Sequence, residues 1–168
     1  TIYVRVENND NINCNAIITF DFDVFDQPTA NSVTDYELCD DATDGDDTNG
    51  FSTFDLSTID MQVLDTQDAM QFNVSYYANQ ADADDSMNVL PTSYVNTTAG
   101  GNPVVARIEN VDNANCFSTI TFNVVVNPLP VIMQPVTLSQ CDDDTDGFSD
   151  FNLTEANPLL SNDSANET

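Results

Sequence analysis

The chain repeats itself, and the length of the repeat limits the folds available to it. Residues 2–8 read IYVRVEN and residues 104–110 read VVARIEN, which gives an offset of 102 residues (104 − 2). A period of this length is that of one small domain. The sequence therefore predicts the end of one copy at 1–28, a complete copy at 29–130 and the start of another at 131–168, within a longer polypeptide. Other residues match at the same offset of 102: Cys14 matches Cys116, Phe20 matches Phe122 and Cys39 matches Cys141. After an insertion the offset becomes 97 (148 − 51), and Phe51 matches Phe148.

Apolar residues recur at every second position within each copy, which is typical of half-buried strands. Strands are expected at 35–39, 51–56, 72–76, 93–97, 104–108 and 120–126. Residues 57–65 are expected to form one or two helical turns, and residues 110–115 a hairpin loop. About seven short strands per copy favour an all-β fold made of tandem immunoglobulin-like antiparallel β-sandwich repeats.

Two acidic loops occupy the same place in successive copies and carry the residues best suited to bind a metal. The later loop reads CDDDTDGF from Cys141, so that aspartates alternate before a glycine. This spacing resembles the opening of a calcium-binding loop, because hard carboxylate oxygens suit Ca²⁺ and glycine permits the bend behind them. Leu153 stands where an EF-hand needs glutamate, so the scaffold is another one. The alternative is a solvated acidic turn.

The expected calcium ligands are Asp40, Asp41, Asp44 and Asp46 in the earlier loop and Asp142, Asp143, Asp144 and Asp146 in the later one. Asp82, Asp84 and Asp150 are candidates for additional ligands. Asp82 and Asp84 could instead cap a short helical turn.

Charge and composition exclude several classes of function. The chain has 29 acidic residues and two basic ones, a net charge of −27, and no histidine. Such a charge repels nucleic acid and anionic membranes, and bound calcium would relieve its self-repulsion. The sequence has no apolar run long enough to span a membrane. The lack of histidine removes Ser-His-Asp and Cys-His nucleophiles, and we expect no enzyme.

Four cysteines without histidine argue against an ordinary zinc site and favour disulfides in an oxidising, extracellular setting. Two pairings fit the repeat: Cys39 with Cys116 inside one copy, or Cys14 with Cys39 and Cys116 with Cys141 across the boundaries. Ten extended residues beyond Cys14 carry the chain about 33 Å away from it. Because a disulfide spans at most about 7 Å between Cα atoms, we expect the pairing of Cys39 with Cys116.

Arg5 and Arg107 are the two basic residues, and they occupy equivalent positions. The arginines could recognise an acidic partner. We favour a structural salt bridge, because one arginine per copy amid so many carboxylates will find a local one.

Residues 36–41 (YELCDD), 50–56 (GFSTFDL) and 76–84 (YYANQADAD) carry a resemblance to a known family. They resemble repeats of giant surface proteins of Bacteroidota that are exported by the type IX system, some of which are gliding or attachment adhesins. The resemblance implies a cell-surface location and tandem sandwiches in an elongated form.

We therefore expect a calcium-stiffened stalk or filament repeat of a long extracellular adhesin. Its partners would be the neighbouring repeats and, in a filament, laterally associated chains. The alternative is a binding module that grips a glycan or protein through exposed loops, with Tyr77, Tyr94 and Phe117 as the aromatic residues to check.

Overall fold

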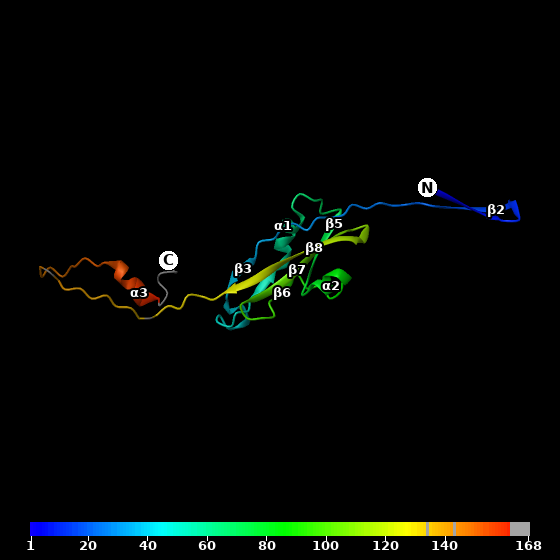
Figure 1. Ribbon diagram of the computed structural model, residues 1–168. Helices are drawn as coiled ribbons and strands as arrows, with labels where there is room; N and C mark the ends of the chain where they lie inside the picture. Colours follow the sequence, from blue (N-terminus) through cyan, green and yellow to red (C-terminus); the bar gives the residue numbers. More distant parts are fainter. Residues whose placement is uncertain (134, 143, 162–168) are drawn as a thin grey trace. The chain divides into compact units, whose positions relative to one another are not determined.

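Strands dominate the computed structural model, which describes residues 1–133, 135–142 and 144–161 (Figure 1). The strands are β1 (Ile2–Asn8), β2 (Asn11–Phe20), β3 (Tyr36–Cys39), β4 (Thr53–Asp55), β5 (Phe72–Tyr77), β6 (Ser93–Val95), β7 (Gly101–Asn110) and β8 (Asn113–Asn127). The helical segments are η1 (Ala42–Asp44), η2 (Leu56–Ile59), α1 (Asp60–Leu64), α2 (Gln80–Asp85), η3 (Leu153–Ala156) and α3 (Asn157–Leu160). Each predicted strand has its counterpart, and the predicted all-β class is confirmed.

The main sheet has four strands in the order β3-β8-β7-β5. Strand β5 runs antiparallel to β7, with Phe72 opposite Asn110. Strand β3 runs parallel to β8, with Tyr36 beside Val124 and Cys39 beside Asn127. The expectation of a purely antiparallel sheet is therefore wrong at this edge. The long connection between β3 and β8 in sequence permits the parallel pairing, which a short hairpin turn would not.

A second sheet in the described part of the chain pairs only β4 with β6. Strand β4 leads directly into η2 and α1, the helical turns predicted over residues 57–65. The Asp55 side chain accepts a hydrogen bond from the Ser57 N–H (3.2 Å) and so caps η2. The apolar residues of this segment, Leu56, Ile59, Val63 and Leu64, are buried.

Strand β7 is buried on both faces, whereas its alternating sequence predicts one buried face. Val104, Ala106 and Ile108 are fully buried on the expected face. Val105 and Arg107, on the opposite face, are buried as well. Val105 clusters there with Tyr77 of β5 and Ala83 of α2, so a helix that the periodicity of two does not reveal covers this face.

Segments aligned by the sequence offset make the same contacts. The Arg5 guanidinium donates to the Ile12 carbonyl (2.9 Å) in the β1–β2 hairpin. The Arg107 guanidinium likewise donates to the Ala114 carbonyl (2.6 Å) in the β7–β8 hairpin. The Met133 N–H donates to the Leu160 carbonyl (2.8 Å), and the Asn31 N–H donates to the Val63 carbonyl (3.2 Å). These contacts agree with the two offsets derived from the sequence.

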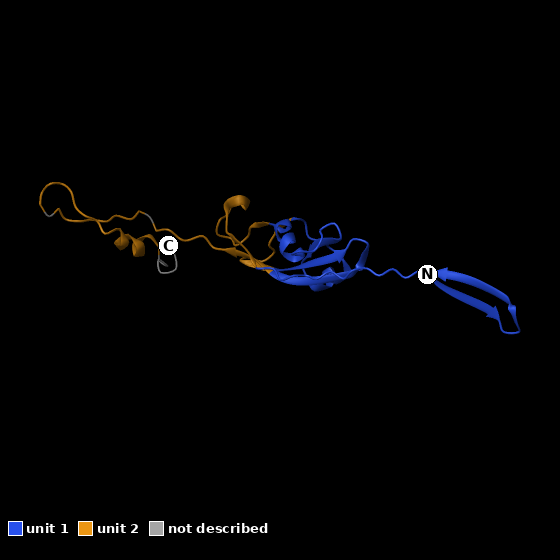
Figure 2. Cartoon of the chain, turned by 90° about the horizontal axis from the view of Figure 1, so that it is seen from above, with its two compact units in different colours: residues 1–34, 55–92, 103–122 blue, residues 35–54, 93–102, 123–168 orange. Residues whose placement is uncertain are grey.

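The chain divides into two compact units (Figure 2). One comprises residues 1–34, 55–92 and 103–122, and the other comprises residues 35–54, 93–102 and 123–168. The predicted copy boundaries after residues 28 and 130 stay predictions. Among the described residues, none of the helices combines the length and the apolar character needed to cross a membrane.

Candidate functional site

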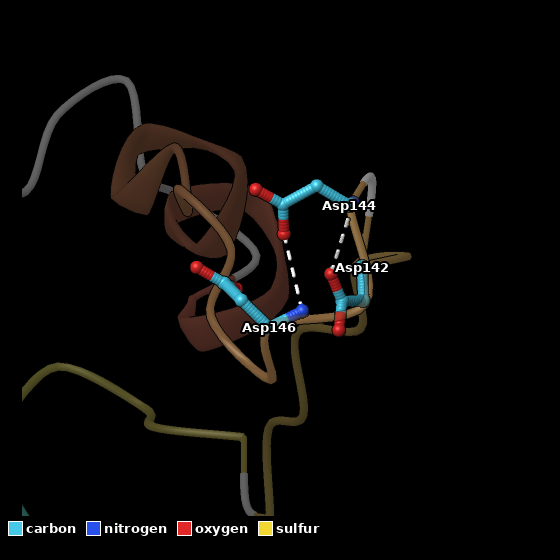
Figure 3. Close-up of side chains that lie close together, drawn as sticks. All are labelled: Asp142, Asp144 and Asp146. Atoms are coloured by element: carbon cyan, nitrogen blue, oxygen red, sulfur yellow. Dashed lines mark hydrogen bonds between the residues drawn. The ribbon is translucent and has the colours of Figure 1, made fainter.

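The later acidic loop gathers three of its predicted ligands (Figure 3). Asp142, Asp144 and Asp146 each place one carboxylate oxygen within 4.8 Å of the others, and all three side chains are exposed. Thr145 and Gly147 adopt positive φ values of 70° and 84°, which turn the chain tightly between and behind the aspartates. Asp143, also a predicted ligand, lies outside the described residues.

Backbone amides organise this loop around Asp142. Its Oδ1 accepts hydrogen bonds from the N–H groups of Asp144 (3.2 Å) and Thr145 (2.9 Å), and its Oδ2 accepts one from Gly147 (2.8 Å). These bonds, led by the one from Gly147, lower the pKa of Asp142 below its ordinary value. The carboxylate is therefore ionised at neutral pH, as a calcium ligand must be.

Asp144 and Asp146 each accept a backbone hydrogen bond through Oδ1, from Asp146 (3.1 Å) and from Phe148 (2.8 Å). Asp150 lines an open hollow together with Asp144 and Asp146. Three exposed carboxylates with a fourth nearby suit a hard divalent cation that completes its coordination with water. The donor set of the later loop thus fits calcium.

The earlier loop has a different arrangement because its insertion changes which residue matches which. The Asp40 Oδ2 accepts from the Gly50 N–H (2.7 Å), as the Asp142 Oδ2 accepts from Gly147. The Asn49 Oδ1 accepts from the Phe51 N–H (2.8 Å), as Asp146 accepts from Phe148. Asn49, and not Asp44, therefore occupies the place of Asp146. This removes one carboxylate from the earlier site.

The remaining predicted ligands of the earlier loop bind neighbouring groups. Asp41 accepts from the Thr43 N–H (2.8 Å) and Asp46 from the Thr48 hydroxyl (2.7 Å), while Asp44 accepts from the Asn49 side-chain amide (2.7 Å). Within the described residues, the group at 142–146 is the only set of three carboxylates close enough to share a cation. Asp40 is nonetheless buried, and its Oδ1 has no hydrogen-bond partner there.

Asp82 and Asp84 belong to α2, where side-chain amides bind their carboxylates. Asp82 accepts from Asn79 (2.6 Å) and Asn88 (2.8 Å), and Asp84 accepts from Gln80 (2.7 Å). Asn79 caps the helix by accepting from the Asp82 N–H (2.9 Å). These two aspartates thus support a helical turn, although the cap itself is Asn79.

The register of β3 on β8 separates Cys39 from Cys116. Cys39 lies beside Asn127, the last residue of β8, and Cys116 lies near the first. The 11 residues from Cys116 to Asn127 (127 − 116) are all strand and advance about 36 Å. A disulfide tolerates about 7 Å between Cα atoms, so this register does not favour the predicted pairing of Cys39 with Cys116 inside one copy, which stays a prediction. All four cysteines are free in the structure.

The segment of residues 26–31, which we call the incoming segment, spans the predicted boundary after residue 28 and is bound to the rest of the complete copy. The Asn110 side chain donates to the Asp26 carbonyl (3.1 Å), and the Gln27 side chain donates to the Phe117 carbonyl. The Gln67 side chain donates to the Thr29 carbonyl (2.7 Å) and accepts from the Thr29 N–H (2.9 Å). Sequence reasoning missed these amides because single polar residues give no periodic signal.

Arg107 is a buried structural residue. Its guanidinium pairs with Glu109 (2.8 Å), donates to the Ala83 and Asp84 carbonyls (2.7 and 3.1 Å) and lies 3.7 Å from the centre of the Phe117 ring. Arg5 pairs with Glu7 (3.1 Å) in the same manner. The aromatic residues of the alternative binding module offer little surface, because Tyr77 and Tyr94 are buried.

These features define an all-β domain with an acidic loop and with cysteines near opposite ends of its longest strand. The chain belongs to the family of the Flavobacterium inter-domain disulphide bond domain, whose model matches residues 35–130. The match covers all of β3 to β8 and bears out the Bacteroidota part of the resemblance. The giant adhesin repeat and type IX export stay predictions. No curated protein and no solved structure matches the chain.

Proposed function

We propose that this chain is a stalk or filament segment of a long extracellular surface adhesin, built from tandem immunoglobulin-like copies. The support comes from apolar side chains that are exposed in the β1–β2 hairpin and in the residues just after it, and that are buried at the equivalent positions of the complete copy. Val24, for example, is 95% exposed and Val126 is 4% exposed. The other pairs are Ile2 and Val104, Val4 and Ala106, Val6 and Ile108, Phe20 and Phe122, and Phe22 and Val124.

Such a hairpin needs partner strands to cover its apolar face, because an isolated two-stranded hairpin is marginally stable at best. In the complete copy, β5 and β3 pair with the two edges of β7 and β8, and the apolar residues of these strands are buried. The same elements of a preceding copy would cover β1 and β2. The exposed apolar face of the hairpin thus supports an array of copies, in which the other elements of its own copy would bury that face.

The joint between copies has no flexible linker, which favours a stiff stalk. Phe25 is the equivalent of Asn127, the last strand residue of a copy (127 − 102). The next residue, Asp26, is already bound to Asn110 and to Gln71 (2.7 Å) of the following copy. Consecutive copies therefore share a boundary without a free linker residue.

The family description names an inter-domain disulphide bond, and we extend this bond to the present chain. A covalent joint would hold neighbouring copies under load. Lateral association of chains and a cell-surface location belong to the same proposal, which includes no enzymatic activity.

The stalk is tested by its length. Variants of the chain that carry residues 29–130 once, twice and three times should grow by a constant increment of about 50 Å in small-angle X-ray scattering. The increment follows from the 15 residues of β8 at about 3.3 Å each. Growth with the square root of copy number would show flexible joints and would contradict the stalk.

Calcium at the later loop is part of the proposal, and Asp142, Asp144 and Asp146 would hold it. Replacing Asp144 by asparagine removes one of three carboxylates and should weaken calcium binding by roughly tenfold or more. Isothermal titration of the chelator-treated chain with calcium chloride measures this. The exposed Asp65→Asn exchange is the matched control, with the same loss of charge outside both loops. Equal affinities of the two variants would assign the loop to a solvated acidic turn.

A further inference from the structure

We propose that the disulfide between copies has a fixed polarity: the Cys39 position of one copy bonds to the Cys116 position of the copy that follows it. This inference rests on the proposed array and names the two thiols that form its joint. Neither of the pairings considered from the sequence alone has this polarity.

Cys39 marks the end of the domain at which the chain leaves. It is the register partner of Asn127, and the N–H of the next residue, Asp40, donates to the Asn127 carbonyl (2.8 Å). Cys39 is exposed at the last position of an edge strand. Asn127 is followed by the last three residues of its copy (130 − 127) and then by the next copy, so this thiol lies at the outgoing joint.

Cys116 marks the end at which the chain arrives. It adjoins Phe117, whose carbonyl accepts from the Gln27 side chain of the incoming segment. Phe117 also lies under the Arg107 guanidinium, which fixes this part of β8. Cys116 is partly exposed. Its thiol therefore lies beside the incoming joint.

The repeat offset brings these two ends together. In the preceding copy, the Cys39 position lies beside the equivalent of Asn127, which is Phe25 of this chain (127 − 102). Phe25 is two residues before Gln27, and Gln27 contacts the neighbour of Cys116. Two extended residues cover about 7 Å, so the residue beside the Cys39 position of the preceding copy lies close to the residue that contacts the neighbour of Cys116. The thiol of the preceding copy and that of Cys116 thus meet at one joint.

The same placement disfavours the bond between Cys116 and Cys141. Cys141 is the Cys39 position of the next copy, so it belongs to the outgoing end of that copy. Cys116 belongs to the incoming end of its own copy. Two copies would have to fold back on each other to join these thiols, and the boundary without a free linker residue opposes such folding.

The bond forms by thiol–disulfide exchange with a disulfide-donor oxidoreductase of the oxidising compartment. The two cysteine thiols lose two protons and two electrons as one S–S bond forms. The electrons reduce the disulfide of the donor to a dithiol. In vitro, oxidised glutathione takes the place of this donor.

The test uses the full chain with residues 29–130 duplicated in place, so that residue 130 of the first copy precedes residue 29 of the second. The forward variant keeps Cys39 of the first copy and Cys116 of the second, with serine at every other cysteine. The reverse variant keeps Cys116 of the first copy and Cys39 of the second. A same-copy variant keeps Cys39 and Cys116 of the first copy. Each therefore carries two cysteines of the same types.

After equilibration with reduced and oxidised glutathione, thiol titration and non-reducing peptide mapping follow the monomer. The forward variant should lose both thiols, and the reverse and same-copy variants should keep them. Closure of the reverse variant alone, or equal closure of both, would overturn the polarity while keeping a bond between copies. If none of the variants formed a disulfide, the inter-domain disulfide itself would be contradicted. The proposal of a stalk is tested separately, by the length increment in X-ray scattering. A second set with alanine in place of serine, and circular dichroism of the reduced chains, verify that the variants fold.

Discussion

Replacing Arg107 by alanine should lower the free energy of unfolding by about 3–5 kcal/mol. The side chain is 3% exposed, and its removal leaves the Glu109 carboxylate without its cation. It also removes one donor from each of the Ala83, Asp84 and Ala114 carbonyls. A buried acceptor without a partner costs free energy that no contact in the variant restores. Urea denaturation of the chain measures the change.

Arg5→Ala is the matched control for this prediction. Arg5 makes the same pair with Glu7 and the same bond to the Ile12 carbonyl, but its side chain is 51% exposed. Its replacement should change the free energy of unfolding by less than about 1 kcal/mol, because water screens the ion pair and satisfies the freed carbonyl. Arg107→Lys restores the charge without the planar fork, and it should recover part of the loss at most. Equal effects of Arg5→Ala and Arg107→Ala would show that burial does not set the contribution of Arg107.

The strands could be predicted because each has a local signal, whereas their arrangement could not. Alternation locates the strand at 104–108, but it does not show that α2 covers the face of Val105 and Arg107. The alternation of apolar and polar residues is also the same for parallel and antiparallel neighbours. The direction of β3 beside β8 therefore could not be predicted from the sequence.

The later acidic loop could be predicted because its signal is local: its carboxylates lie within five residues of one another. The earlier loop could not, because hydrogen bonds to Gly50 and Phe51, and not sequence spacing, decide that Asn49 replaces an aspartate. The pairing of the cysteines could not be decided from sequence spacing alone, because the register of β3 beside β8 has no local signal in the sequence. That register places Cys39 at one end of β8 and so changes the pairing that is geometrically open.

Replacing Gly101 by alanine should destabilise the chain by about 4 kcal/mol or more. Gly101 has a φ of 122°, which residues with a Cβ rarely adopt. A Cβ at this position would overlap the backbone carbonyl of Val124 in β8. Neither backbone can move without opening the sheet, because the Val126 N–H donates to the Gly100 carbonyl (3.1 Å) beside it. The urea midpoint should fall accordingly.

Gly100→Ala separates this overlap from the cost of a positive φ. Gly100 has a φ of 84°, but an added Cβ would meet nothing within 4 Å, so its replacement should cost about 1–2 kcal/mol. Val124, which the Gly101 substitution would displace, is also the register partner of Tyr36, and Cys39 ends the same strand β3. Gly101→Ala should therefore also reduce disulfide closure in the forward two-copy variant, and Gly100→Ala should leave it intact. Both glycine variants could instead form the disulfide fully and unfold at the same urea concentration. That result would show that the close approach of β7 to β8 does not hold β3 in place.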